Sequence, residues 1–398
     1  MRVPLLELTT QNGALADQLK TTAAAVIDSG RYIMGPEIDA FEVEVARYSG
    51  AAHGVSVSSG TDAILLALMA LEIGPGDEVI IPSFTFFATA GCVSRTGATP
   101  VFADCCKRCF NLRASDIEPL ITEKTKAIIP VHLFGQCSPL DEVLALAKKH
   151  SLHVVEDTAQ AIGARIGERQ AGSMGTASAF SFFPSKNLGG FGDSGIVLTQ
   201  DADLAERMRI LRNHGSAPKY YHSHIGGNFR MDPLQAALLR LKLPQLDGYL
   251  AARRANAAHY RAGLAGVDGV DGVETAAQSS GCTSGCLSEQ SSARLILPVE
   301  LEGHFHTYNQ FTLRLPGKGR RDALRTYLNE AEIGAEIYYP LPLHKQACFA
   351  NLPTAAQPLP NCEQLAEEVV SIPIYPELEE AQVAFVIEKI KSFLESEN

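Results

Sequence analysis

The stretch SFFPSKNLGG at residues 181–190 places Lys186 in a glycine-rich loop, directly after an apolar run typical of a buried strand. A lysine that forms Schiff bases must be held rigidly, partly out of water and near backbone donors. Such a loop meets these needs, although an ordinary lysine in a surface loop fits the same stretch when it is taken alone. The neighbouring segments decide between these interpretations.

An aspartate, Asp157, ends the preceding strand-like run in the stretch VVEDTAQ at 154–160. Functional groups of α/β sheets gather at the C-terminal ends of strands. A carboxylate there suits pyridoxal 5'-phosphate (PLP), because PLP enzymes that use the ring as an electron sink need an acidic partner at the pyridine nitrogen. Taken alone, Asp157 fits a helix N-cap equally well.

A second strand-to-helix junction has the sequence SSGTD at 58–62. Glycine lets the backbone approach a ligand, and the N–H groups that begin a helix bind anions, so Gly60 and Thr61 suit a phosphate. The hydroxyl of Ser181 could reach the same phosphate. A plain capped helix start explains the junction as well.

Two further loops contain candidate ligand contacts. Phe86, in IPSFTFFAT at 81–89, could stack on a planar ring or belong to the core. Asn228 and Arg230, in GGNFRMD at 226–232, could donate to a phosphate or carboxylate, or lie in a solvated turn.

Short apolar runs alternate with helical stretches between residues 50 and 200, which predicts an α/β fold with a mostly parallel sheet flanked by helices. The predicted strands are Val55–Ser58, Val79–Ile81, Val101–Ala103, Ala127–Val131, His153–Glu156, Ala179–Phe183 and Gly195–Thr199, and the predicted helices are Asp62–Leu71, Phe87–Val93 and Leu140–His150.

The remaining chain predicts a smaller α+β unit. We expect a large domain at 1–245 and a small C-terminal domain at 246–398, with a flexible insertion at about 274–293 that is rich in Ser, Gly, Cys and Gln. Within the small domain we expect an exposed strand at Tyr308–Leu315, a helix at Arg321–Ala331, a strand at Ala335–Tyr339 and a closing helix at Ala381–Leu394.

Bulk properties exclude several classes of protein. The net charge of −11 makes nucleic acid an unfavourable partner. The sequence shows neither a signal peptide nor an apolar run long enough to span a membrane, so we expect a cytoplasmic protein. Nine cysteines lack zinc-finger spacing, so we expect free thiols and no metal site; a disulfide between the cysteines at 105–109 and those at 282–286 stays open.

Together these segments resemble the DegT/StrS-type nucleotide-sugar aminotransferases, a group within the fold type I PLP-dependent transferases. The resemblance runs from about Gly30 to Tyr339. It rests on GRYIMGPE at 30–37, SSGTDA at 58–63, GPGDEVIIPSFTFFAT at 74–89, IIPVHLFGQ at 128–136, VVEDTAQAIGA at 154–164, SFFPSKNLGGFGDSG at 181–195, GGNFRMDPLQAALL at 226–239 and YYPLPLHKQ at 338–346.

The resemblance implies a role for each matching position. Lys186 would carry PLP and move the proton during transamination. Asp157 would pair with the pyridine nitrogen, Gln160 would reach the ring hydroxyl, and Phe86 would cover the ring. The phosphate would be held by Gly60, Thr61, Ser181 and, from the neighbouring subunit of a homodimer with shared active sites, Asn228. Substrate contacts would come from Arg230, Tyr338 and His344, the last being first among five histidines considered (His132, His214, His224, His306 and His344).

The form KNLGG after the lysine resembles the branch that acts at C3 of a sugar linked to UDP or dTDP, with L-glutamate as donor and 2-oxoglutarate as product. A C4-acting enzyme and a non-catalytic PLP or sugar sensor are the alternatives, and the intact Lys186 argues against the sensor. The chain departs from the usual pattern at Ser194, where glycine is more common, and at Cys105–Cys109, where relatives have a short acidic turn.

Overall fold

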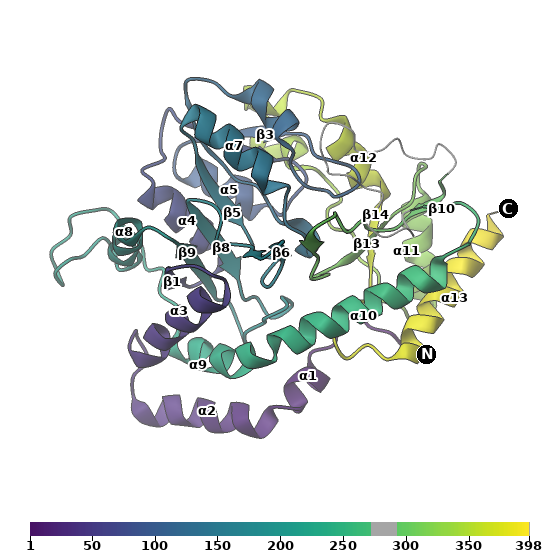
Figure 1. Cartoon of the computed structure of the whole chain (residues 1–398), viewed down its shortest axis with the longest axis horizontal. Coiled ribbons are helices and arrows are strands. Elements are labelled where there is room, and N and C mark those ends of the chain that lie inside the picture. Colours follow the sequence, from purple (N-terminus) through teal and green to yellow (C-terminus); the bar gives the residue numbers. More distant parts are fainter. Residues whose placement is uncertain (272–292, 398) are drawn as a thin grey trace.

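The computed structural model describes residues 1–271 and 293–397, and its centre is a seven-stranded sheet (Figure 1). Strand β9 runs antiparallel to both of its neighbours, and the other neighbouring strands are parallel. The C-terminal ends of the six remaining strands therefore lie at one edge. In spatial order the strands are β1 (His53–Val57), β9 (Gly195–Thr199), β8 (Ala177–Ser181), β5 (His153–Asp157), β4 (Thr125–Ile128), β2 (Glu78–Pro82) and β3 (Thr99–Ala103).

The predicted α/β class and mostly parallel sheet are confirmed, and helices cover both faces. Alternate strand residues enter different apolar clusters, as strand geometry requires. Val155 packs in the cluster that contains α4 and α5, whereas Val154 packs in the one that contains α7. The helices around this sheet are α3 (Pro36–Tyr48), α4 (Gly60–Ala70), α5 (Ala88–Arg95), α6 (Ala114–Ile117), α7 (Leu140–His150), α8 (Ala202–Arg212) and α9 (Pro233–Lys242).

Helix α4 is apolar on nearly every side, which is typical of a helix buried in a core. It begins where β1 ends, and its N-cap is Ser59, whose hydroxyl accepts a 3.0 Å hydrogen bond from the N–H of Asp62. The cap expected from SSGTD is therefore present, and it aims the first turn of α4 at the edge where the parallel strands end.

A second sheet, with its own apolar core, lies toward the C-terminus. Helix α10 runs from the large sheet to this second sheet and lies beside α13 (Figure 1). Val3 also packs in the second core. The elements are β10 (Val270–Asp271), β11 (Leu295–Ile296), β13 (Phe311–Arg314) and β14 (Val369–Ile372) with α10 (Leu246–Leu264), α11 (Arg320–Glu330), α12 (Pro360–Glu368) and α13 (Glu380–Ser396). We propose a domain boundary at the start of α10, with the first residues of the chain joined to the smaller unit.

Some predictions for this C-terminal part are wrong. The strand expected to be exposed at Tyr308–Leu315 is β13, and its four residues are buried because it lies between β11 and β14. Ala335–Tyr339 forms no strand, only a bridge between Glu336 and Ser371. The insertion at 274–293 lies outside the described residues except for Ala293.

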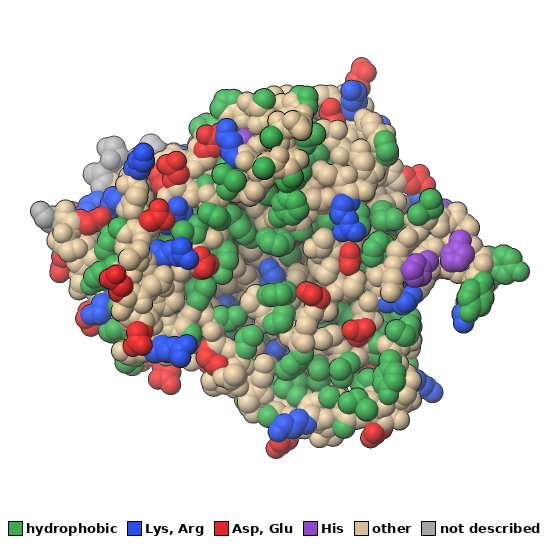
Figure 2. All heavy atoms as spheres, turned by 180° about the vertical axis from the view of Figure 1, so that it is seen from behind, with side chains coloured by type: hydrophobic (Ala, Val, Ile, Leu, Met, Phe, Trp, Pro, Cys, Tyr) green, Lys and Arg blue, Asp and Glu red, His purple; other side chains and the backbone are tan. Residues whose placement is uncertain are grey.

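Three smaller features complete the fold. A small sheet joins β6 (Arg165–Ile166), β7 (Arg169–Gln170) and β12 (His304–Phe305), and α1 (Thr9–Gly13) and α2 (Ala16–Ser29) form an N-terminal arm. Between α8 and α9 a loop projects from the body with exposed Tyr220, Tyr221 and Ile225, and Figure 2 shows a protruding tip with hydrophobic and histidine side chains.

Within the described ranges, no helix combines the length and hydropathy that a membrane span requires.

Candidate active site

Lys186 lies in a tight loop that begins directly after β8. Its own N–H donates to the carbonyl of Phe183 at 2.8 Å, which folds the loop back on itself. A side chain at Gly189 would begin 2.2 Å from the carbonyl oxygen of Pro184, so this turn requires glycine. Lys242, on α9, holds the same loop through a 2.7 Å hydrogen bond to the carbonyl of Gly189. The glycines thus fix the lysine at the edge where the strands end.

The electrostatics of Lys186 suit a nucleophilic amine. Burial lowers the pKa of this lysine to about 8, and the charge of Asp157 opposes that shift only in part. A larger fraction of the amine is therefore neutral near physiological pH than in an exposed lysine.

Asp157 is the last residue of β5, and its carboxylate is buried. It accepts hydrogen bonds from the hydroxyl of Thr89 at 2.8 Å and from the N–H of Ala159 at 3.3 Å. Burial raises the pKa of this carboxyl group, while Thr89, Ala159 and the charge of Lys186 oppose the rise. No helix of the described chain begins at Asp157, so the N-cap interpretation is wrong.

The segment after Asp157 places an amide next to an aromatic group. Gln160 accepts a 2.6 Å hydrogen bond from the N–H of Phe134 and donates one of 3.2 Å to the hydroxyl of Tyr339. The ring of Tyr339 lies 6.2 Å, centroid to centroid, from that of Phe86, which is 57% exposed. Tyr339 was not selected from the sequence, although it stands in the quoted YYPLPLHKQ. Burial and the charge of Asp157 raise the pKa of its phenol.

Gly60, at the start of α4, lies against Ser181, at the end of β8. A side chain at Gly60 would begin 2.6 Å from the Cβ atom of Ser181, so only glycine leaves this approach open. Gly60 and Thr61 form the first turn of α4, whose N–H groups are free of intrahelical partners at this end. The arrangement fits a phosphate held by backbone N–H groups and a serine hydroxyl.

The loop at 226–232 lies against the same edge, because the carbonyl of Phe229 accepts a 2.8 Å hydrogen bond from the N–H of Ser58. Asn228 is exposed in this loop. Arg230 is half-buried, and its Nε atom is buried without a hydrogen-bond partner among the described residues. An anionic ligand would satisfy that donor.

His344 lies inside the protein. Its Nδ1 atom is 2.6 Å from the hydroxyl of Ser83 and its Nε2 atom is 3.1 Å from the carboxylate of Glu363. Both ring nitrogens are therefore engaged within the chain, and His344 supports the segment that leads to Phe86. Tyr338 is half-buried, and its ring centroid lies 6.0 Å from that of Tyr339.

Asn187, next to the lysine, escaped the sequence analysis. Its side chain is buried, and neither amide atom has a hydrogen-bond partner in the described part of the chain. No sequence pattern distinguishes an asparagine of this kind from one with partners.

Within the described ranges, one group of neighbouring side chains offers atoms that could bind a metal ion: Asp104, Cys105 and Cys362. The two sulfur atoms are 3.5 Å apart, as in a thiol–thiol hydrogen bond. The carboxylate of Asp104 already accepts from the N–H groups of Asn361 and Cys362 at the start of α12. These contacts explain the cluster without a metal ion, because they hold the loop after β3 against α12.

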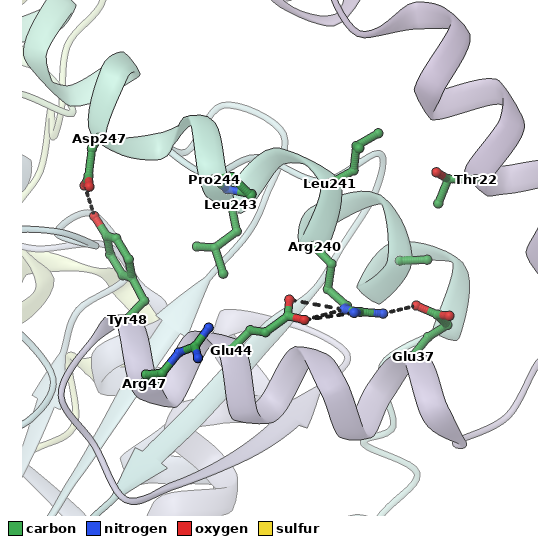
Figure 3. Close-up of a pocket in the computed structure, with 11 residues that line it drawn as sticks. Thr22, Glu37, Glu44, Arg47, Tyr48, Arg240, Leu241, Leu243, Pro244 and Asp247 are labelled. Carbon is green, nitrogen blue, oxygen red and sulfur yellow. Dashed lines mark hydrogen bonds and ion pairs between the residues drawn. The ribbon is translucent and has the colours of Figure 1, made fainter.

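A pocket of about 770 Å³ lies away from these residues, between α2, α3 and the α9–α10 junction (Figure 3). Several of its polar groups are paired with one another. Arg240 pairs with Glu37 at 2.6 Å and with Glu44 at 2.8 Å, and Tyr48 donates to Asp247 at 2.7 Å. The pocket contains none of the candidate site residues.

Comparison with known proteins identifies the family of this chain. Residues 14–391 match the DegT/DnrJ/EryC1/StrS aminotransferase family. The chain belongs to this family. It is 44% identical to a UDP-N-acetyl-3-dehydro-α-D-glucosamine 3-aminotransferase from Acidithiobacillus ferrooxidans, over 98% of both chains. It is 43% identical to a pleiotropic regulatory protein from Geobacillus stearothermophilus, over 99% of both chains.

The fold of this chain is also similar to that of a relative whose structure has been solved. The crystal structure of DesV from S. venezuelae, in complex with a ketimine intermediate, superposes with a TM-score of 0.90 at 41% identity and covers 99% of both chains. The predicted assignment to the DegT/StrS-type group and its fold is confirmed.

Proposed function

We propose that this chain transfers an amino group from L-glutamate to the 3-keto group of a sugar linked to UDP or dTDP. The main support is the electrostatic interaction between Lys186, whose pKa is lowered, and the buried carboxylate of Asp157, at the edge of the sheet where the parallel strands end. The 44% identity to a 3-aminotransferase, over nearly the whole of both chains, supports the C3 position.

The residues at this edge fit PLP, which when bound supplies an aldehyde for the amine and a ring that accepts electrons. In the proposal Lys186 would bind the aldehyde group and would move the proton at the substrate carbon. Asp157 holds the ring nitrogen, and Gly60, Thr61 and Ser181 hold the phosphate. Gln160 and Phe86 would contact the ring, and the hydrogen bond to Tyr339 orients Gln160.

Recognition of the two substrates also needs basic and aromatic groups. We assign the donor's carboxylate to Arg230, whose Nε atom has no partner among the described residues. Tyr338 is assigned to the sugar nucleotide, and His344 to the support of the Ser83–Phe86 segment. Asn228 is exposed, so a second copy of the chain could receive it, which is why we propose a homodimer with shared sites.

The function is tested with the PLP-loaded enzyme and a panel of 3-amino and 4-amino sugars on UDP and dTDP. Each is added singly while the visible absorption of the bound cofactor is followed. Loss of this absorption with a 3-amino sugar alone supports the proposal and names the nucleotide. Loss with 4-amino sugars alone would refute the C3 position but keep the aminotransferase.

A regulatory role is the second candidate, because one relative is a pleiotropic regulatory protein. A sensor needs to bind its ligand but has no need of a lysine with a lowered pKa. If glutamate and every panel sugar leave the cofactor absorption unchanged, the regulatory role replaces the enzymatic one.

A further inference from the structure

Directly behind Asp157 lies a buried pair, Glu156 and His132, that the proposed chemistry does not use. Consecutive residues of a strand point to opposite faces. Accordingly, Asp157 meets Thr89 of α5, while Glu156 lies on the other face of β5. There its carboxylate is 2.9 Å from the Nε2 atom of His132, and both side chains are fully buried.

Glu156 is held in its ionised form. Its carboxylate accepts hydrogen bonds from the N–H groups of Gly172 at 2.8 Å, Met174 at 2.8 Å and Gly175 at 2.6 Å. Burial opposes ionisation of Glu156, but its hydrogen-bonding and electrostatic interactions with His132 and its hydrogen bonds from the backbone outweigh burial and lower the pKa of the carboxyl group.

His132 does not cancel this charge. The N–H of Ser138 donates to its Nδ1 atom at 3.0 Å, so Nδ1 carries a lone pair and the ring proton is on Nε2. The imidazole is therefore a neutral donor to Glu156. Among the described residues, the other titratable groups that interact with Glu156 or Asp157 are Cys92, Cys137, Lys186 and Tyr339.

The backbone around His132 also holds the main chain of Asp157. The N–H of His132 donates to the carbonyl of Asp157 at 3.0 Å, and the N–H of Asp157 donates to the carbonyl of Pro130 at 2.9 Å. Because Glu156 directly precedes Asp157 in β5 and its carboxylate binds His132, both members of the pair are joined to the backbone that carries the Asp157 carboxylate.

We propose that Glu156 is a positioning residue that, with His132, aims Asp157 and places a second buried negative charge behind it, which strengthens the hold of Asp157 on the protonated ring nitrogen of the cofactor. The inference rests on the proposed function. In surroundings of low dielectric constant, the negative charge of Glu156, one residue from Asp157, would also attract the cation that Asp157 binds.

The test compares Glu156→Gln with the wild type as PLP-loaded enzymes. The midpoint of the pH titration of the cofactor's visible absorption should fall, because the variant loses a nearby anion that favours the protonated form. The acid dissociation constant should rise by roughly tenfold. The turnover number for the glutamate half-reaction should fall by about tenfold or more, while the KM for glutamate changes less than about threefold.

A matched control removes a different buried carboxylate. Glu368 pairs with Arg314 at 2.7 Å in the second core, and Glu368→Gln should leave the midpoint at the wild-type value. His132→Asn loses the donor to Glu156, whereas His132→Gln can place an amide N–H near the Nε2 position, so the first should shift the midpoint more. This pair of variants keeps the test valid if Glu156→Gln does not fold.

The outcomes separate two failures. A wild type that responds to glutamate, together with Glu156 and His132 variants that titrate and turn over like it, overturns the positioning role. Lower thermal stability of the variants with an unchanged midpoint also overturns it, since that is what a purely structural pair would show. A wild type that neither binds PLP nor responds to glutamate overturns the proposed function and this inference with it.

Discussion

The hydroxyl of Thr89, in the first turn of α5, donates a 2.8 Å hydrogen bond to the carboxylate of Asp157 at the end of β5. The bond joins α5 to β5, the strand that carries the carboxylate. It also stabilises the ionised form of a carboxylate whose burial favours the neutral form.

Thr89→Val should weaken cofactor binding. A hydrogen bond to a charged group contributes roughly 1.5–3 kcal/mol, and loss of this one raises the pKa of Asp157 further. We expect the dissociation constant for PLP, measured by titrating the apo protein, to rise by about tenfold or more. Thr312→Val is the control, because that buried threonine bonds Ser371 in the second sheet at 2.8 Å. Equal PLP affinity in Thr89→Val and the wild type would contradict the role given to the bond.

Replacing Lys186 by Ala should abolish transamination. The lysine both carries the cofactor and moves the proton, so the loss of turnover should exceed the ~10²–10⁴-fold effect of a single acid–base group. Lys242 is a second lysine whose pKa burial lowers to about 8, but it bonds the loop carbonyl of Gly189. Borohydride reduction of the PLP-loaded wild type followed by peptide mapping should find the cofactor on Lys186. A label on Lys242 would refute the assignment.

The sequence predicted the large sheet well because each strand there is a short apolar run between polar turns, and residues such as Val154 and Val155 face two apolar layers. It predicted β13 poorly, since alternation in Phe311–Arg314 suggests one wet face and nothing local shows that Arg314 is paired with Glu368 inside the core. Long-range partners of this kind are set by tertiary packing.

The candidate site shows the same division. Lys186 lies in a loop, Asp157 ends β5 and Gly60 begins α4. The local sequence indicates each of these positions, and the structure brings the three residues to one edge of the sheet. Tyr339 lies beside Gln160 although 179 residues separate them, and no spacing rule reveals that contact. The unpartnered amide of Asn187 likewise depends on surroundings that come from other elements.

Gly60→Ala should weaken phosphate binding by a steric effect. The new methyl group would lie 2.6 Å from the Cβ atom of Ser181, so the start of α4 and the end of β8 must separate. We expect the dissociation constant for PLP to rise by about tenfold or more, equivalent to about 1.4 kcal/mol. The matched control is Gly248→Ala in α10, where an added Cβ atom meets nothing within 4 Å. If both variants bind PLP equally well, the cradle formed by Gly60 and Ser181 does not hold the phosphate.

The pH dependence of PLP capture should report the environment of Lys186. Only the neutral amine attacks an aldehyde, and burial lowers the pKa of this lysine to about 8. The rate at which apo protein captures PLP should therefore rise as the pH increases through about 8 and level off above it. The charge of Asp157 opposes the lowering, so Asp157→Asn should move the inflection below that of the wild type. An inflection near 10.5, the ordinary lysine value, would show that the amine is solvated, and an inflection that Asp157→Asn leaves unmoved would show that the two charges do not interact.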